Sequence, residues 1–86
     1  MSTFGNDFKQ EFDLQYEPKD IGKYIVKLRK SRKLSICQLA LRSGMKEPVL
    51  LRVEKGRADP RLSTLLKIIR GLEMSVADFF KVFKKY

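Results

Sequence analysis

Residues 34–56 constrain the fold of this chain most, because they hold two short helical patterns on either side of a glycine. Ser35 and Gln38 are spaced as a capping box, in which each side chain bonds the backbone N–H of the other residue at the start of a helix. Gly44 supplies the positive φ with which the chain leaves that helix and turns sharply into the next one. The segment therefore predicts two helices, over residues 36–43 and 47–55. Two short helices held at a steep angle can place the second one in the major groove of DNA.

Three further helices are predicted from apolar residues that recur at helical spacing. They run from Lys19 or Asp20 to Arg32, over residues 61–72 and over residues 76–84. Asp20 and Ser75 are expected to cap the first and the last of them, and Pro60 suits the first turn of the middle one. The side chains expected in the core are Ile21, Tyr24 or Ile25, Leu28, Leu62, Leu65, Ile68, Ile69, Leu72, Phe79 and Phe80. Because no hairpin pattern is present, the predicted fold is all-α with five helices.

The length of 86 residues predicts one domain, residues 19–86, preceded by an arm of residues 1–18. Residues 1–20 hold two lysines against five carboxylates, a net charge of −3, whereas residues 21–86 hold 17 basic side chains against five acidic ones, a net charge of +12. So positive a domain attracts polyanions, and nucleic acid, an anionic membrane surface or an acidic protein would each satisfy that charge. A core this small often gains stability from oligomerisation.

Cysteine and histidine usage excludes several kinds of site. Cys37 is the only cysteine and there is no histidine, which leaves neither a disulfide framework nor a zinc site, and no cofactor is expected. Cys37 falls in an apolar helical pattern, so it is expected to be buried. No apolar run approaches the roughly 18–20 residues that a membrane span needs, and the N-terminus lacks a secretory signal pattern. A cytoplasmic protein is therefore expected.

The arm carries large apolar side chains, more than a free tail in water would keep exposed. Their spacing fits one face of a helix or, in the second half of the arm, an alternating strand. We expect these side chains to pack on the domain, on a second subunit or on a partner protein: Phe4, Phe8, Phe12, Leu14 and Tyr16. Leu66, Val82 and Phe83 are surplus to one small core and are candidates for a dimer interface or partner contact.

A series of short motifs spans residues 21–83. They are Leu28-Arg29, Leu34-Ser35 with Leu39-Ala40, Gly44, Leu50 with Val53-Glu54 and Gly56, Pro60, and Met74-Ser75 with Phe79-Phe80. In this order and at this spacing they resemble the Cro/repressor-type (Xre-like) helix-turn-helix family, which implies the lambda-repressor-like fold. In size and at its C-terminal end the chain also resembles controller proteins of restriction systems and some antitoxins.

The resemblance implies a buried ion pair between Arg29 and Glu54, which both lie beside core positions. It also implies that the start of the second motif helix meets base edges, through Lys46, Glu47, Pro48, Leu51 and Arg52. The start of the first motif helix meets the DNA backbone through its N–H groups. The predicted phosphate contacts are Ser35 and Gln38 together with the basic side chains Lys33, Arg42, Lys55, Arg57 and Arg61.

Three residues depart from the family pattern. Ile36 stands where the family often has a glutamine that bonds a phosphate and a base. Glu47 places an acid at the base-reading end, where phosphates repel it although cytosine N4 can donate to it. Pro48 lacks an N–H and biases Glu47 away from the helical conformation, which favours a second motif helix that begins a residue late. Leu51 then presents an apolar surface suited to a thymine methyl group or to a protein.

The first function hypothesis is a sequence-specific transcriptional regulator that binds double-stranded DNA as a two-fold dimer. Its recognition helices would lie about 34 Å apart on a pseudo-palindromic operator. The alternative is an antitoxin or another protein-interaction module on the same fold, with the arm binding a partner protein. An enzyme is not expected, because the chain has no histidine, no nucleophile beside a base and no glycine-rich phosphate loop. No helix pairs a basic face with a broad apolar one, so a membrane-surface role is not expected either.

Overall fold

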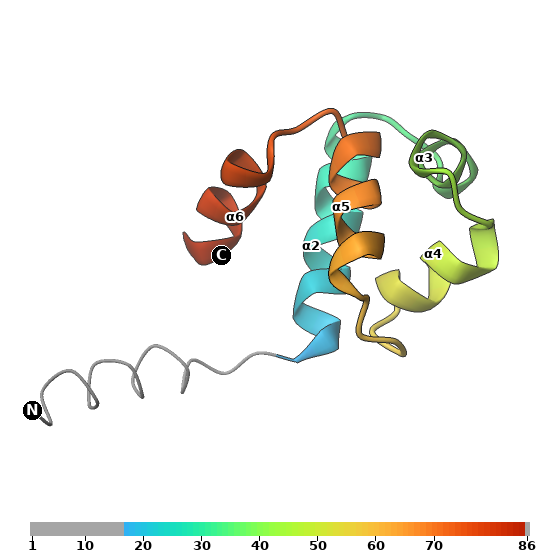
Figure 1. Cartoon of the computed structure of the whole chain (residues 1–86), viewed down its shortest axis with the longest axis horizontal. Coiled ribbons are helices and arrows are strands. Elements are labelled where there is room, and N and C mark those ends of the chain that lie inside the picture. The colour runs from blue at the N-terminus through green and yellow to red at the C-terminus, as the bar shows by residue number, and fades with distance from the viewer. Residues whose placement is uncertain (1–16, 86) are drawn as a thin grey trace, which may run out of the picture.

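The computed structural model describes residues 17–85, with side chains from residue 17 to residue 81. Its helices are α2 (Pro18–Ser31), α3 (Ile36–Ser43), α4 (Glu47–Glu54), α5 (Leu62–Gly71) and α6 (Val76–Lys85). No strand occurs among these residues, and the prediction of an all-α fold is confirmed. In Figure 1, α2 and α5 cross the centre of the molecule, α3 and α4 form its right-hand end, and α6 lies on the left. The main helix contacts join α3 to α5, α2 to α4 and α3 to α4.

The start of α2 differs from the prediction. Glu17 is the N-cap residue, and its backbone N donates to Asp20 Oδ2 at 2.9 Å. Asp20 is therefore the third residue of the helix rather than its cap. Pro18 occupies the first helical position, where its missing N–H would have had no partner within the helix. The helix consequently begins at Pro18 rather than after it.

One hydrophobic core draws on every helix. Its buried side chains are Ile21, Tyr24, Ile25, Leu34, Leu39, Ala40, Leu50, Val53, Leu65, Ile68, Ile69, Leu72 and Phe79. Leu28 is partly buried against this core, as predicted. Tyr24 and Phe79 join the two ends of the described chain, with ring centroids 4.9 Å apart and a hydrogen bond of 2.9 Å from the Tyr24 hydroxyl to the Phe79 carbonyl.

Three expectations near α5 and α6 are wrong. Leu62 is 66% exposed although it lies on the same side of α5 as Leu65 and Ile69, because it is the first residue of the helix. Phe80 is 38% exposed, since it follows Phe79 by about 100° around the helix and only one of the two can face inward. Pro60 lies outside the helix, because α5 begins at Leu62 with Arg61 as its N-cap residue.

The ends of α2, α3, α4 and α5 share one backbone arrangement. Each ends in a residue of positive φ, followed by a residue whose N–H bonds the carbonyl five positions earlier. The residues of positive φ are Lys33 at 57°, Gly44 at 70°, Gly56 at 73° and Glu73 at 59°. Gly44 confirms the predicted turn. These arrangements reverse the chain within a few residues and so allow short helices to pack closely.

Candidate nucleic-acid interface

The predicted helix-turn-helix consists of α3, the turn at Gly44 and α4. Ser35 Oγ accepts from the Gln38 backbone N at 3.0 Å, and Gln38 Oε1 accepts from the Ser35 backbone N at 2.8 Å, so the capping box is present. Leu39 and Leu50, one on each helix, are fully buried beneath the turn. The angle between α3 and α4 is therefore set by buried side chains as well as by the turn itself.

The inner face of α4 lies against α2 at a glycine. A Cβ atom on Gly22 would lie 2.5 Å from the Val53 carbonyl oxygen and 2.6 Å from that of Glu54. Such distances leave no room for any side chain at this position, so the backbone of α2 sits directly on the last turn of α4. The contact fixes the distance between the α2 and α4 backbones, and hence how far the outer face of α4 extends from the domain.

An ion pair holds the same end of α4. Arg29 Nε lies 2.8 Å from Glu54 Oε2, and Arg29 Nη2 lies 3.1 Å from Glu54 Oε1, which makes the contact bidentate. Arg29 Nη1 also donates to the Leu34 carbonyl at 3.0 Å, where the chain enters α3. The Glu54 side chain is only 4% exposed and that of Arg29 13%. The pair implied by the family resemblance thus links α2, α4 and the start of α3 in one network.

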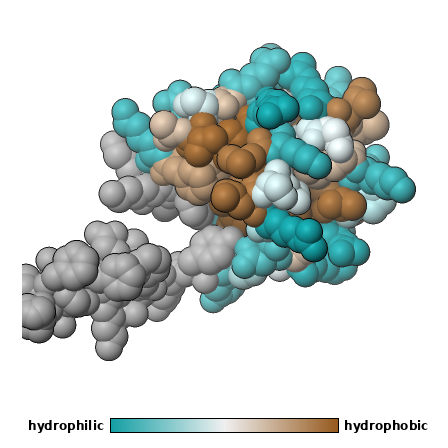
Figure 2. Space-filling view, in the orientation of Figure 1, coloured by the Kyte–Doolittle hydropathy of each residue, from teal (hydrophilic) through white to brown (hydrophobic). Residues whose placement is uncertain are grey.

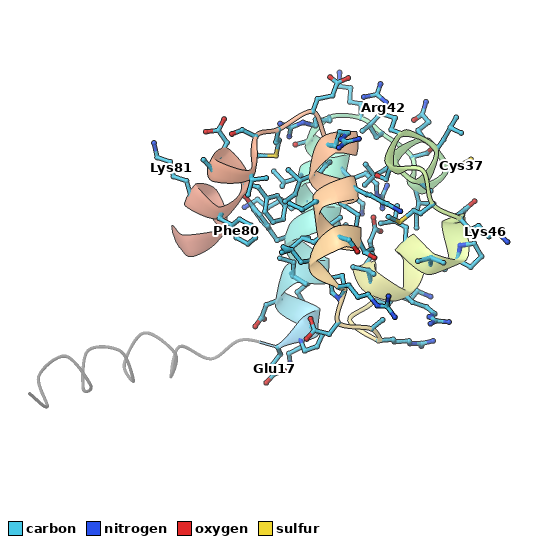
Figure 3. All side chains as sticks on the ribbon, in the orientation of Figure 1. Glu17, Cys37, Arg42, Lys46, Phe80 and Lys81 are labelled. Carbon is cyan, nitrogen blue, oxygen red and sulfur yellow. The ribbon has the colours of Figure 1, made fainter. Side chains whose placement is uncertain are left out.

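The outer face of α4 is fully accessible. All of the predicted base-contact residues are exposed: Lys46, Glu47, Pro48, Leu51 and Arg52. In Figure 3, Lys46 lies at the right-hand edge of the molecule, at the start of α4. The expected late start of α4 is wrong, because the helix begins at Glu47 and a proline in the first turn costs no hydrogen bond.

Val49 belongs to the same surface and was missed by the sequence reasoning. It is 44% exposed, at one edge of the outer face of α4. The buried stripe of this helix consists of Leu50, Val53 and Glu54 alone. A helical projection centred on those three positions would have placed Val49 outside the core.

All of the predicted phosphate contacts are exposed: Lys33, Ser35, Gln38, Arg42, Lys55, Arg57 and Arg61. Three of these residues already have partners within the protein. Ser35 and Gln38 are engaged with each other in the capping box. Arg42 lies 3.3 Å from Glu73 in an ion pair whose side chains are 46% and 76% exposed, and so contributes little to stability. In Figure 3, Arg42 points to the top of the molecule, away from Lys46.

Cys37 was expected in the core, and this expectation is wrong. The side chain is exposed, on the right-hand side of the molecule in Figure 3. α3 buries the face that carries Leu39, Ala40 and Ser43, and Cys37 shares the opposite face with Leu41, which is 81% exposed. Apolar residues occupy more than half of the circumference of this two-turn helix, so their presence alone did not identify its buried side.

A second accessible surface is apolar and lies at the other end of the domain. Leu66, Val76 and Phe80 are 38%, 46% and 38% exposed, and they belong to α5 and α6. A shallow groove of about 440 Å³ runs beside them, with Ile69, Met74 and Arg70 in its lining. Figure 2 shows hydrophobic side chains gathered where α5 and α6 meet.

Several predicted partner contacts fall outside the described parts of the structure. They are the arm residues Phe4, Phe8, Phe12, Leu14 and Tyr16, and the side chains of Val82 and Phe83. Between residues 17 and 81, no cluster of acidic, cysteine and histidine side chains could hold a metal ion. In the described part of the chain, no helix is long and apolar enough to cross a membrane.

Comparison with known proteins identifies relatives across most of the chain. The sequence model of a helix-turn-helix family matches residues 25–79. A protein of Haemophilus influenzae, described as an uncharacterized HTH-type transcriptional regulator, is 33% identical over 73 residues, which cover 78% of this chain and 74% of that protein.

Solved structures share the fold. The restriction-modification controller protein C.Esp1396I, solved as a tetramer in complex with its natural 35-base-pair operator, matches with a TM-score of 0.78 and 22% identity, over 83% of this chain and 93% of that one. The controller protein C.AhdI from Aeromonas hydrophila matches with a TM-score of 0.69 and 27% identity, over 73% of this chain and 96% of that one.

Proposed function

The chain belongs to the helix-turn-helix family of DNA-binding transcriptional regulators, and on this premise we propose that it binds a pseudo-palindromic operator as a two-fold dimer. One observation carries the proposal: α4 is locked on its inner face by Gly22 and the Arg29–Glu54 pair, while its outer face is accessible from Lys46 to Arg52. A helix held in this way can enter a major groove without rearranging the core. Base contacts would then come from the outer face of α4.

The phosphate contacts follow from the same placement. The capping box uses the N–H groups of Ser35 and Gln38, and the N–H groups of Ile36 and Cys37 in the first turn have no partner within the helix. These two N–H groups, with the positive end of the helix dipole, suit one phosphate. Lys55, Arg57 and Arg61 follow α4 directly and suit the phosphates on the other side of the groove. Arg42 would first exchange Glu73 for a phosphate.

The dimer would use the apolar surface of α5 and α6. Leu66, Val76 and Phe80 are exposed there, and burying them against a second copy would remove apolar area from water. A dimer formed at this end leaves α4 free on the opposite side. Two-fold symmetry would then set two recognition helices about 34 Å apart, one helical turn of DNA.

A salt titration of DNA binding tests the proposal. Affinity of the full chain for a duplex selected from random sequences should fall steeply with salt, with a slope of about −0.9 per neutralised phosphate in a log–log plot. Arg57→Ala should flatten that slope by about one unit, the loss of one phosphate contact. Lys81→Ala is the matched control: it removes the same charge from α6, on the side of the molecule away from Lys46 in Figure 3, and should leave the slope unchanged. An affinity that does not change with salt would contradict the proposal.

Binding of a protein partner by the arm stays a prediction, as do the cytoplasmic location and the absence of catalysis, which fit this family. Deletion of residues 1–16 separates the two roles of the chain. A regulator that reads DNA with α4 should keep its affinity for the selected duplex. A module that acts through the arm should lose its partner instead.

A further inference from the structure

We propose that α4 distinguishes A·T from G·C pairs by the thymine methyl group, and that Leu51 and Val49 are the side chains that contact it. The proposal rests on the proposed function, because it requires α4 to lie in the major groove. It goes further by assigning the chemistry with which this particular helix reads sequence. Three observations support it: the polar groups that α4 lacks, the position of its exposed apolar side chains, and the absence of a role for them in the core.

The chemistry of α4 leaves few ways to read an A·T pair. Residues 46–55 contain no asparagine, glutamine, serine or threonine. Bidentate recognition of adenine N6 and N7 requires an amide side chain, and none is present on this helix. Arg52 can bond guanine O6 and N7 together, and Glu47 can accept from cytosine N4. Both of these polar contacts read G·C pairs.

The apolar side chains lie where such a contact is needed. α4 buries Leu50, Val53 and Glu54, so Leu51 and Val49 lie at the two edges of the outer face. Arg52 lies between those edges, three positions after Val49 and one after Leu51. A guanine bonded by Arg52 would therefore have an apolar side chain above the neighbouring base step on either side. The thymine C5-methyl is the one apolar group that a base edge presents in the major groove.

Neither Leu51 nor Val49 has a role in the core that would explain an apolar side chain at its position. Leu51 is 38% exposed and Val49 is 44% exposed, whereas Leu50 and Val53 are 0% and 2% exposed. The partly buried side chains that pack against the core are Leu28, Ile36, Met45 and Met74, and they include neither of the two. Two exposed apolar residues on the face that meets DNA are therefore available for a ligand. The expected half-site holds a guanine beside at least one thymine.

Uracil substitution tests this directly, because it removes the methyl group and keeps every hydrogen-bonding atom of thymine. The full chain is first used to select its operator from random duplexes, and each thymine of a half-site is then replaced singly by uracil. At one or more of these positions affinity should fall about fourfold, the value expected for one buried methyl-sized group. Guanine replaced by 7-deazaguanine should weaken binding at the position of Arg52, since it removes N7.

Variants of the chain show which residue makes the contact. Leu51→Ala or Val49→Ala should bind the thymine and uracil duplexes with nearly equal affinity, because the side chain that senses the methyl group is gone. Leu41→Ala is the matched control, since it shortens a leucine that is 81% exposed on α3, and it should keep the fourfold preference of the unchanged chain. Because all three substitutions are at exposed positions, the fold should survive them.

The outcomes distinguish the two proposals. Selection of a duplex with salt-dependent affinity, together with uracil sensitivity that is lost in the Leu51 or Val49 variant, supports both. A selected duplex that tolerates uracil at every position, or uracil sensitivity unchanged in both variants, overturns methyl reading and leaves DNA binding intact. Failure to select any duplex overturns the proposed function, and methyl reading with it.

Discussion

The two ends of the described domain are held in opposite ways. At the α4 end, the close approach at Gly22, the Arg29–Glu54 pair and the buried Leu50 act together on one helix of eight residues. At the α6 end, Phe79 is the only buried side chain between residues 76 and 81. The first helix is fixed from several directions, and the described part of the second is anchored at one point.

The surfaces of the two ends also differ, because one is charged and the other is apolar. The α4 end exposes charged side chains on the outer face of α4, the face proposed to read DNA. The inner face of α4 is already packed against the rest of the domain. The α6 end exposes Leu66, Val76 and Phe80 beside a shallow groove. A rigid, complete surface suits a rigid ligand such as duplex DNA. A lightly anchored helix with apolar side chains suits a second copy of the chain, which would complete its burial. We therefore call the α4 end the reading end, because it is proposed to contact DNA, and the α6 end the assembly end, because it is proposed to contact a second copy.

The largest expected effect comes from breaking the ion pair at the reading end. Glu54→Ala leaves the Arg29 guanidinium buried without its carboxylate partner and should lower the free energy of unfolding by about 3–5 kcal/mol. Urea denaturation followed by circular dichroism measures the change. A domain of this size has little stability to spare, so the variant should be largely unfolded at 37 °C.

A double variant shows whether the charge or the packing matters. Arg29→Met with Glu54→Leu removes both charges and keeps similar volume, and its stability should be close to that of the unchanged chain. If the double variant is as unstable as Glu54→Ala, the end of α4 depends on the hydrogen bonds of the pair, and the cost of a stranded charge is not the explanation.

The next effect tests the close approach of α2 and α4. Alanine in place of glycine inside a helix ordinarily stabilises it by about 0.5–1 kcal/mol. Gly22→Ala should instead lower the free energy of unfolding by about 1–3 kcal/mol, because the new methyl group meets the carbonyls of Val53 and Glu54. Urea denaturation measures the sign of the change in the free energy of unfolding, and a decrease would show that the contact between α2 and α4 cannot relax. A more stable variant would show that α4 can move away from α2 at no cost.

The helices were predictable where the sequence carries local signals. The capping box at Ser35 and Gln38 and the glycine turn at Gly44 each involve neighbouring residues, and the predicted bounds of α3 are those observed. Ser75 caps α6 as predicted, with its Oγ accepting from the Asp78 backbone N at 3.0 Å. Family resemblance added the Arg29–Glu54 pair, whose two members lie 25 positions apart.

The remaining features depend on packing between segments distant in sequence, which leaves no local pattern. Nothing near Gly22 shows that Val53 will lie against it. Cys37 was misplaced because a helix of two turns with apolar residues over more than half of its circumference does not reveal its buried side. Val49 was missed for the related reason that the reading face was taken from the family pattern, whereas the buried stripe of α4 decides which side chains it includes.

A smaller effect tests the assembly end. Leu66→Ser should weaken self-association by about tenfold, equivalent to about 1.4 kcal/mol, because it removes an apolar side chain from the proposed dimer surface. Leu41→Ser is the matched control, since it changes an exposed leucine at the reading end and should leave the dimer unaffected. Sedimentation equilibrium measures both. Equal effects of the two substitutions would show that the apolar surface of α5 and α6 is not where the copies meet.

The smallest effect concerns the single anchor of α6. Burial raises the pKa of the Tyr24 hydroxyl above its ordinary value of 10.0, and the nearby Arg32 only partly opposes this. The folded state therefore keeps the phenol protonated at pH values where the unfolded chain ionises. The stability that Tyr24 contributes is fully present below pH 10.0 and is lost as the pH rises through the folded-state pKa.

Tyr24→Phe isolates this contribution. At pH 8 the variant should be less stable by about 1 kcal/mol, because the hydrogen bond to the Phe79 carbonyl is gone. Between pH 8 and pH 11 the difference in urea midpoint between the two proteins should shrink, since only the unchanged chain loses the contribution of a buried phenol. A difference that stays constant over that range would mean that the pKa of Tyr24 is the same in the folded and the unfolded states. A difference near zero at every pH would mean that the attachment of α6 depends on ring packing against Phe79 and not on the hydroxyl. Ring packing alone would make the attachment of α6 independent of pH, and the contrast with the charge-dependent α4 end would then be sharper still.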